Sequence, residues 1–141
     1  MASFSLSRGL RAAGVAACVL AFHAGVASAD GVKVTLSGSQ EVPPVTTSAS
    51  GNGVITVNPD KSVSGSITTS GIAATAAHIH VGAAGKNGPV IVPLSKSGDG
   101  FSVPAGAKLT DEQMKSFKAG GLYVNVHSAA HPGGEIRAQL K

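Results

Sequence analysis

Alternation of apolar and polar residues, interrupted every few positions by glycine, proline, asparagine or aspartate, runs through most of this sequence. Successive side chains of a strand point to opposite faces, so a period of two is typical of short β-strands with one buried face. The segments that show it are 32–36, 53–57, 62–69, 76–81, 89–94, 100–103, 122–127 and 135–140. About eight short strands predict an all-β fold, an antiparallel Greek-key sandwich or barrel.

Two segments depart from the alternation. In residues 110–118, Thr110 and Gln113 form a capping box, and two glycines follow the segment, so we expect one short connecting helix. Residues 38–52 contain Pro43-Pro44, which cannot pair regularly within a sheet. We expect this second segment to be an ordered loop or to cover an edge.

The first 29 residues are typical of a cleavable signal peptide. A basic start and an apolar run over 12–26 precede Ala27-Ser28-Ala29, which fits the small-x-small cleavage pattern. The apolar run is too short for a membrane span. An alternative is a bacterial lipoprotein box, Val-Ala-Ala-Cys, at 15–18. We predict cleavage after Ala29, one folded domain over 30–141, a periplasmic or secreted location, and no integral membrane segment after cleavage.

The composition of residues 30–141 argues against several classes of function. The one cysteine of the sequence, Cys18, precedes this domain, so the domain has no thiolate for catalysis, zinc fingers or iron-sulfur clusters. Nine lysines and arginines against seven acidic residues give a small, dispersed positive charge, which does not indicate a nucleic-acid partner. The sequence has no nucleophile elbow, so we do not expect a hydrolase.

The four histidines of the domain fall in two short segments, His78 and His80 in one, His127 and His131 in the other. Residues two apart in a strand share a face, so His78 and His80 project together, opposite Ile79. The polar faces of the last two strands follow from the same parity. They carry Tyr123, Asn125 and His127, and Glu135, Arg137 and Gln139. We expect the three strands to show one polar surface to solvent.

If the strand of His78 lies near the strand of His127, three imidazoles meet. Neutral imidazole is a good ligand for Cu²⁺ and Zn²⁺. Candidate ligands of a single metal ion are therefore His78, His80, His127 and His131. A cupric site with nitrogen ligands is favoured over a thioether-rich cuprous site, since Met114 is the only methionine of the domain. Zinc is the less favoured alternative.

Asn125 and Arg137 share the polar faces with the histidines. We expect them to support the ligands or to draw small anions toward the metal. The competing interpretation is that the His-x-His pair is simply solvated, that Asn125 is a cross-strand hydrogen-bond partner, and that Arg137 pairs with Glu135 or Asp99.

Three blocks of the chain resemble, in order, successive blocks of the CHRD domain, which was first described in chordin and is frequent in exported bacterial proteins. The blocks are LSGSQEVPPVTTSASGNGVITVNPD, AAHIHVGAAGKNGPVIVPL and GLYVNVHSAAHPGGEIRAQL. The resemblance covers essentially all of residues 30–141. It implies a secreted or periplasmic β-rich module.

A second, local similarity is to copper/zinc superoxide dismutase, in which a His-x-His strand and a later strand ending in histidine supply copper ligands and an arginine guides the anion. His78 and His80, then His127, and finally Arg137 are similar to these positions. The chain lacks the paired cysteines of that enzyme, and only His131 remains for a zinc subsite. The similarity therefore implies a mononuclear copper site.

Two functions follow from these observations. The first is an exported protein that binds a single copper ion through a surface histidine cluster; a superoxide dismutase-like redox activity stays open, but we expect a non-enzymatic role. The second is a cell-envelope interaction module without metal, which a partner protein would contact by adding a strand to a free sheet edge.

Overall fold

The computed structural model describes residues 29–141, and all of the predicted signal peptide except its last residue, Ala29, lies outside the described residues. Nine antiparallel strands form one sheet in the order β5-β4-β8-β9-β1-β2-β3-β7-β6. The strands are β1 (Asp30–Ser37), β2 (Ser50–Val57), β3 (Val63–Ser70), β4 (Ala74–Val81), β5 (Val90–Pro93), β6 (Ser95–Ser97), β7 (Gly100–Ser102), β8 (Leu122–Ser128) and β9 (Ile136–Gln139). The expected all-β fold is confirmed.

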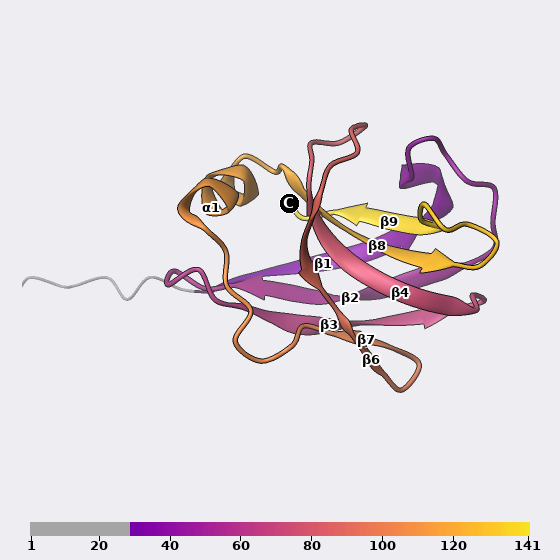
Figure 1. Ribbon diagram of the computed structural model, residues 1–141, viewed down its shortest axis with the longest axis horizontal. Coiled ribbons are helices and arrows are strands. Elements are labelled where there is room, and N and C mark those ends of the chain that lie inside the picture. Colours follow the sequence, from indigo (N-terminus) through magenta and orange to yellow (C-terminus); the bar gives the residue numbers. More distant parts are fainter. Residues whose placement is uncertain (1–28) are drawn as a thin grey trace, which may run out of the picture.

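The sheet folds over into two layers and nearly closes. Strands β9 and β1 pair only at Ser37 and Arg137, and at this junction the sheet turns from the β5-β4-β8-β9 layer into the β1-β2-β3-β7-β6 layer. In Figure 1, β8 and β9 lie in the upper part of the view and β2 and β3 in the lower part. At the opposite ends of the order, only Leu94 separates β5 from β6, so the chain itself connects the two edges of the sheet.

The core lies between the layers and consists of the apolar halves of the alternating strands. Each layer contributes side chains that are no more than 1% exposed. They include Ile79, Val124 and Ile136 from one layer, and Leu36, Ile55 and Ile67 from the other. Because strand parity sends these residues inward, it sends their polar neighbours to the outer faces.

The expected helix is α1 (Asp111–Lys118), which lies at one end of the molecule (Figure 1). Thr110 and Gln113 form the predicted capping box, and Phe117 anchors the helix to the core. In the described part of the chain, no helix has the length and apolar character that a bilayer crossing requires. A single 3-10 turn, η1 (Gly38–Gln40), follows β1.

The structure differs from the expectation in one strand and one boundary. Strand β6 pairs with β7, but all three of its side chains are exposed, so it has no buried face and its sequence shows no apolar alternation. Strand β2 begins at Ser50 rather than Gly53, inside the segment expected to be a loop. Its first residues are small or polar and carry no strand signal, yet they pair in register with β1 and β3.

Replacing Ile79 by alanine should test how strongly the core depends on strand β4. The side chain is 1% exposed, so its loss should lower the free energy of unfolding by about 2–5 kcal/mol. Val90→Ala on the neighbouring strand is the control, because Val90 is 47% exposed and its truncation should cost less than about 0.5 kcal/mol. Urea denaturation gives both values, and equal losses would contradict this account of the core.

Candidate metal centre

Polar side chains cover the outer face of β4, β8 and β9, and the strand register sets their positions. His78 lies opposite Asn125, which lies opposite Arg137 on the next strand. One row further along, His80 lies opposite Tyr123. The expected common surface of three strands is therefore present.

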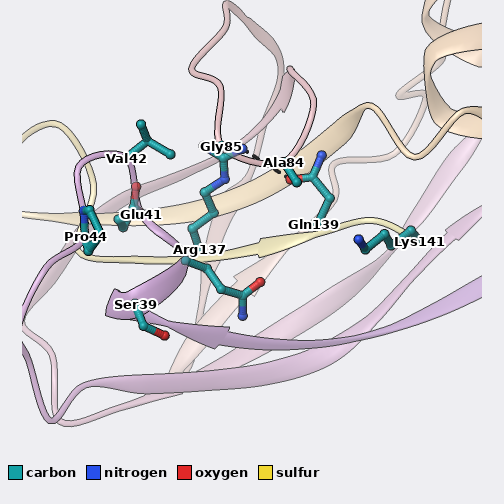
Figure 2. A pocket seen from close by; sticks show the side chains of 10 residues that line it. Ser39, Glu41, Val42, Pro44, Ala84, Gly85, Arg137, Gln139 and Lys141 are labelled. Carbon is teal, nitrogen blue, oxygen red and sulfur yellow. Dashed lines mark hydrogen bonds between the residues drawn. The ribbon is translucent and has the colours of Figure 1, made fainter.

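The expectation that this surface faces solvent is wrong. Tyr123 and Asn125 are 2% exposed and Arg137 is 1% exposed, because two loops fold over the face. One loop, 41–49, leads from η1 to β2, and the other, 82–89, leads from β4 to β5. Figure 2 shows Arg137 rising between them. Parity fixes which face a side chain takes, but it cannot show whether a distant loop covers that face.

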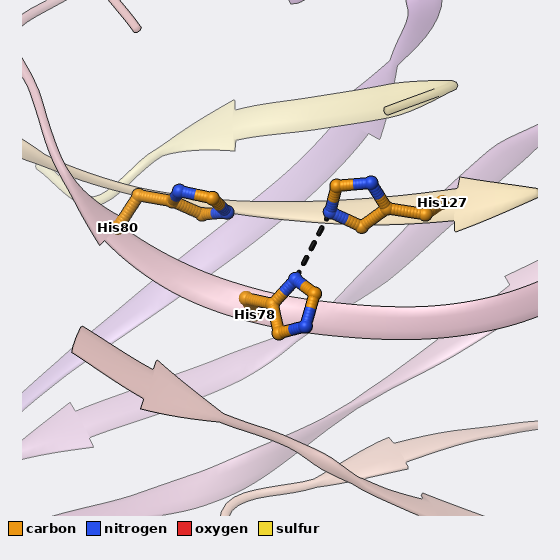
Figure 3. Close-up of side chains that lie close together, drawn as sticks. All are labelled: His78, His80 and His127. Atoms are coloured by element: carbon orange, nitrogen blue, oxygen red, sulfur yellow. Dashed lines mark hydrogen bonds between the residues drawn. The ribbon is translucent and has the colours of Figure 1, made fainter. Parts of the chain in front are cut away.

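Three imidazoles converge on this face, as Figure 3 shows. His127 lies diagonally from His78 across the β4–β8 pair, and Nδ1 of His78 is 3.0 Å from Nε2 of His127. One ring nitrogen from each of His78, His80 and His127 lies within 4.8 Å of the others. Ligands ~2 Å from a common ion can be ~4 Å apart at most, so the widest gap would have to close by about 1 Å.

Backbone carbonyls fix the orientation of two of the rings. Nδ1 of His80 is 2.9 Å from the carbonyl oxygen of Gly88, and Nδ1 of His127 is 2.9 Å from that of Pro132. Because a carbonyl only accepts hydrogen bonds, both Nδ1 atoms carry the proton. In the neutral rings, the lone pair is then on Nε2. This is the arrangement in which a second group holds a metal-binding histidine in its ligating tautomer.

The Nε2 atom of His80 is buried and has no hydrogen-bond partner among residues 29–141. A buried polar atom without a partner costs about 1–3 kcal/mol, so an orphaned lone pair beside two other imidazoles needs an explanation. Burial lowers the pKa of His78, and the neighbouring His127 and His80 lower it further. Burial also lowers the pKa of His80, although the Gly88 carbonyl and the neighbouring Asn125 side chain work in the opposite direction. Both rings are therefore neutral at pH 7, as ligands must be.

Asn125 lies beside the three imidazoles. Its Oδ1 atom is 3.0 Å from Nε2 of His127. An amide oxygen only accepts hydrogen bonds, so this contact needs a proton on Nε2 or another positive charge close to both atoms.

His131 lies apart from the other three histidines, in the turn between β8 and β9. Its backbone N–H donates to the carbonyl of Ser128, and its half-buried side chain lines a pocket of about 240 Å³. It does not belong to the group of three rings that could share one ion.

Arg137 lies beyond Tyr123 from the imidazoles. The Tyr123 ring is stacked on His80 at 4.7 Å between centroids, with 5° between the planes, and the Arg137 guanidinium lies 3.5 Å from the Tyr123 centroid. Since β8 runs between β4 and β9, the tyrosine separates the arginine from His80. The expected pairing of Arg137 with Glu135 or Asp99 is absent; the Glu135 carboxylate instead accepts hydrogen bonds from Thr47 and Ser128.

Sequence reasoning missed Glu41, which lies in the loop of residues 41–49 and is 4% exposed. Burial raises its pKa to about 7, and Arg137 and Asn125 only partly offset this effect. Gly134 makes the close approach possible, because a Cβ atom there would lie 2.5 Å from Oε1 of Glu41 and 2.6 Å from Nδ2 of Asn125. A carboxylate in a proline-rich loop gives no signal of burial, so only the tertiary structure shows it.

Replacing Glu41 by glutamine should stabilise the protein in a pH-dependent way. Stability from a raised carboxyl pKa is fully present below the unfolded value of 4.5 and is lost as pH rises through about 7. Relative to the wild type, E41Q should therefore gain about 1–3 kcal/mol more at pH 8 than at pH 5, after allowance for screening by solvent in the adjoining pockets. Urea denaturation at both pH values measures this gain. D99N removes an exposed carboxylate, and its effect on stability should be the same at the two pH values. If the effect of E41Q were also the same at both, Glu41 would not be a buried acid with a raised pKa.

Comparison with known proteins identifies the family of the chain. No curated protein and no solved structure matches it significantly. The family model of the CHRD domain matches residues 32–140, which spans every strand and all of the side chains described above. The sequence blocks that resembled this domain are thus parts of one continuous match, and the chain belongs to the CHRD domain family.

Proposed function

We propose that this protein is exported and binds a single copper ion through His78, His80 and His127. The observation that carries the proposal is the buried Nε2 of His80, which has a lone pair, no hydrogen-bond partner in residues 29–141, and two further imidazoles beside it. A metal ion would satisfy this atom and would supply the positive charge that the contact between Asn125 and His127 needs.

The donor set favours copper. Three imidazole nitrogens suit Cu²⁺ and Zn²⁺, while thiolate and thioether donors, which suit Cu⁺, are absent from the group. For a given set of nitrogen and oxygen ligands, Cu²⁺ binds more tightly than Zn²⁺. Zinc is therefore the competitor rather than the expected ion. If the signal peptide is removed on export, the exported chain contains no cysteine. No thiol of the same chain would then compete with the histidines for copper.

The geometry favours binding over catalysis by a two-metal centre. His131 lines a pocket that the other three histidines do not line, and it is not part of their group. The three remaining histidines therefore provide one metal site. Three nitrogen ligands leave a position for water or a small ligand, which is how a redox step would become accessible. Tyr123 lies between Arg137 and His80, and two loops bury Arg137. An anion guided by Arg137 to the metal ion would therefore have to pass both the loops and the tyrosine ring.

Copper titration of single alanine variants tests the proposal. Alanine at His78, His80 or His127 should each weaken Cu²⁺ binding by at least ~10-fold and remove nitrogen couplings from the paramagnetic resonance spectrum. His131→Ala is the matched control: it removes a histidine of the same domain that lies outside the group, and its copper affinity should equal that of the wild type. Retention of wild-type affinity by all three cluster variants would rule out this site.

A further inference from the structure

Arg137 is a buried cation without a direct ion pair among the described residues, although the charge of Glu41 acts on it from beyond 4.0 Å. Its side chain is 1% exposed, and three of its five N–H groups donate to neutral oxygens of Asn87, Ala83 and Gln139 at 3.2–3.3 Å. Within residues 29–141 the ion pair is Lys61–Asp111, so no carboxylate lies within 4.0 Å of this guanidinium. Buried charges are costly unless they are paired, and arginine is almost never buried alone. A direct ionic partner for the guanidinium is therefore missing from the described chain, and a bound anion would supply one.

A pocket opens beside this guanidinium (Figure 2). Its volume is about 430 Å³, which is within the range of small-molecule sites. The loop of residues 41–49 and the loop of residues 82–89 contribute to its walls. Its lining includes both charged and apolar side chains. Arg137 and Lys141 are its positively charged members, and Val42, Pro44 and Ala84 are among its apolar members.

Glu41 lines the same pocket, and its Oε1 atom is buried without a hydrogen-bond partner. Glu41 and Arg137 do not form an ion pair within 4.0 Å, although each would satisfy the other. A carboxylate placed between them would accept hydrogen bonds from the guanidinium and from the protonated Glu41 carboxyl group. Such an anion satisfies both orphaned groups, whereas a neutral ligand leaves the arginine charge uncompensated.

We propose that this pocket binds a small organic carboxylate, with its carboxylate on Arg137 and Glu41 and its carbon chain against Val42, Pro44 and Ala84. A planar carboxylate matches the fork of an arginine, and its single charge suits a site that already contains an acidic side chain. An ionised Glu41 would repel either anion, and it would repel a phosphate dianion more strongly than a singly charged carboxylate. The apolar wall adds a preference for ligands with a short aliphatic or aromatic portion.

This site is separate from the proposed metal centre. Tyr123 lies between the two, stacked on His80 and in contact with Arg137. It is the only tyrosine of the sequence, which has no tryptophan, so its fluorescence reports on this region alone. Carboxylate binding can therefore be measured in metal-free protein, and its outcome is independent of whether copper binds.

Isothermal titration of the metal-free protein with butyrate tests the proposal, with phosphate and chloride at matched ionic strength as comparison anions. Butyrate should bind saturably with one site per chain, change the fluorescence of Tyr123, and bind more tightly at pH 6 than at pH 8. The pH effect is expected because the anion favours protonated Glu41. The other charged or titratable groups that line the two pockets beside Glu41 are Arg137, Lys141 and His131.

Two variants make the test specific. Ala84→Phe places a ring at the exposed rim of the pocket and should weaken butyrate binding by at least ~10-fold without affecting the thermal midpoint of unfolding. Lys86→Ala removes an exposed charge from the same loop without touching the pocket, and its affinity should match that of the wild type. No saturable butyrate binding, tighter binding of phosphate, or unchanged affinity in A84F would each overturn the proposal.

Discussion

The antiparallel register between β4 and β8 is the constraint on which the functional part of this molecule depends. It sets His78 opposite Asn125 and His80 opposite Tyr123, and so brings His127 next to His78. A slip of one residue would turn every side chain of one strand to the other face, and the histidines would enter the apolar core. The core residues on the inner faces, such as Ile79 and Val124, prevent this slip. The packing that stabilises the fold therefore also assembles the cluster.

The outer face of the same strands is a second, polar interior. Loops over its buried side chains supply partners for most of their polar atoms, as in the hydrogen bonds of Arg137 to the side chain of Asn87 and the carbonyl of Ala83. Nε2 of His80 and Oε1 of Glu41 are the exceptions among the described residues. Buried polar groups are usually satisfied, and those that are not tend to mark functional positions. His80 belongs to the group of three imidazoles, whereas Glu41 lines the pocket beside Arg137, so the two exceptions support two separate sites.

Local patterns predicted what depends on local geometry. Alternation located eight of the nine strands, the capping box located α1, and parity predicted that His78, His80 and His127 share a face. Three features could not be predicted in this way. The strand β6 has no buried face, the cover over Arg137 comes from loops distant in sequence, and the burial of Glu41 depends on a close approach to Gly134. All three are set by contacts between segments, for which a single sequence carries no periodic signal.

The near closure of the sheet limits how this protein can associate with other chains. A free strand edge offers unpaired backbone groups to which any extended peptide can attach. Here the two outermost strands, β5 and β6, follow each other along the chain with only Leu94 between them, and Leu94 itself still donates its N–H to Ala77. An incoming peptide could pair only with the short edge strands β5 and β6, which have four and three residues. The architecture therefore disfavours aggregation by pairing of edge strands. This matters for residues 30–141, which contain no cysteine and so cannot be stabilised by a disulfide bond.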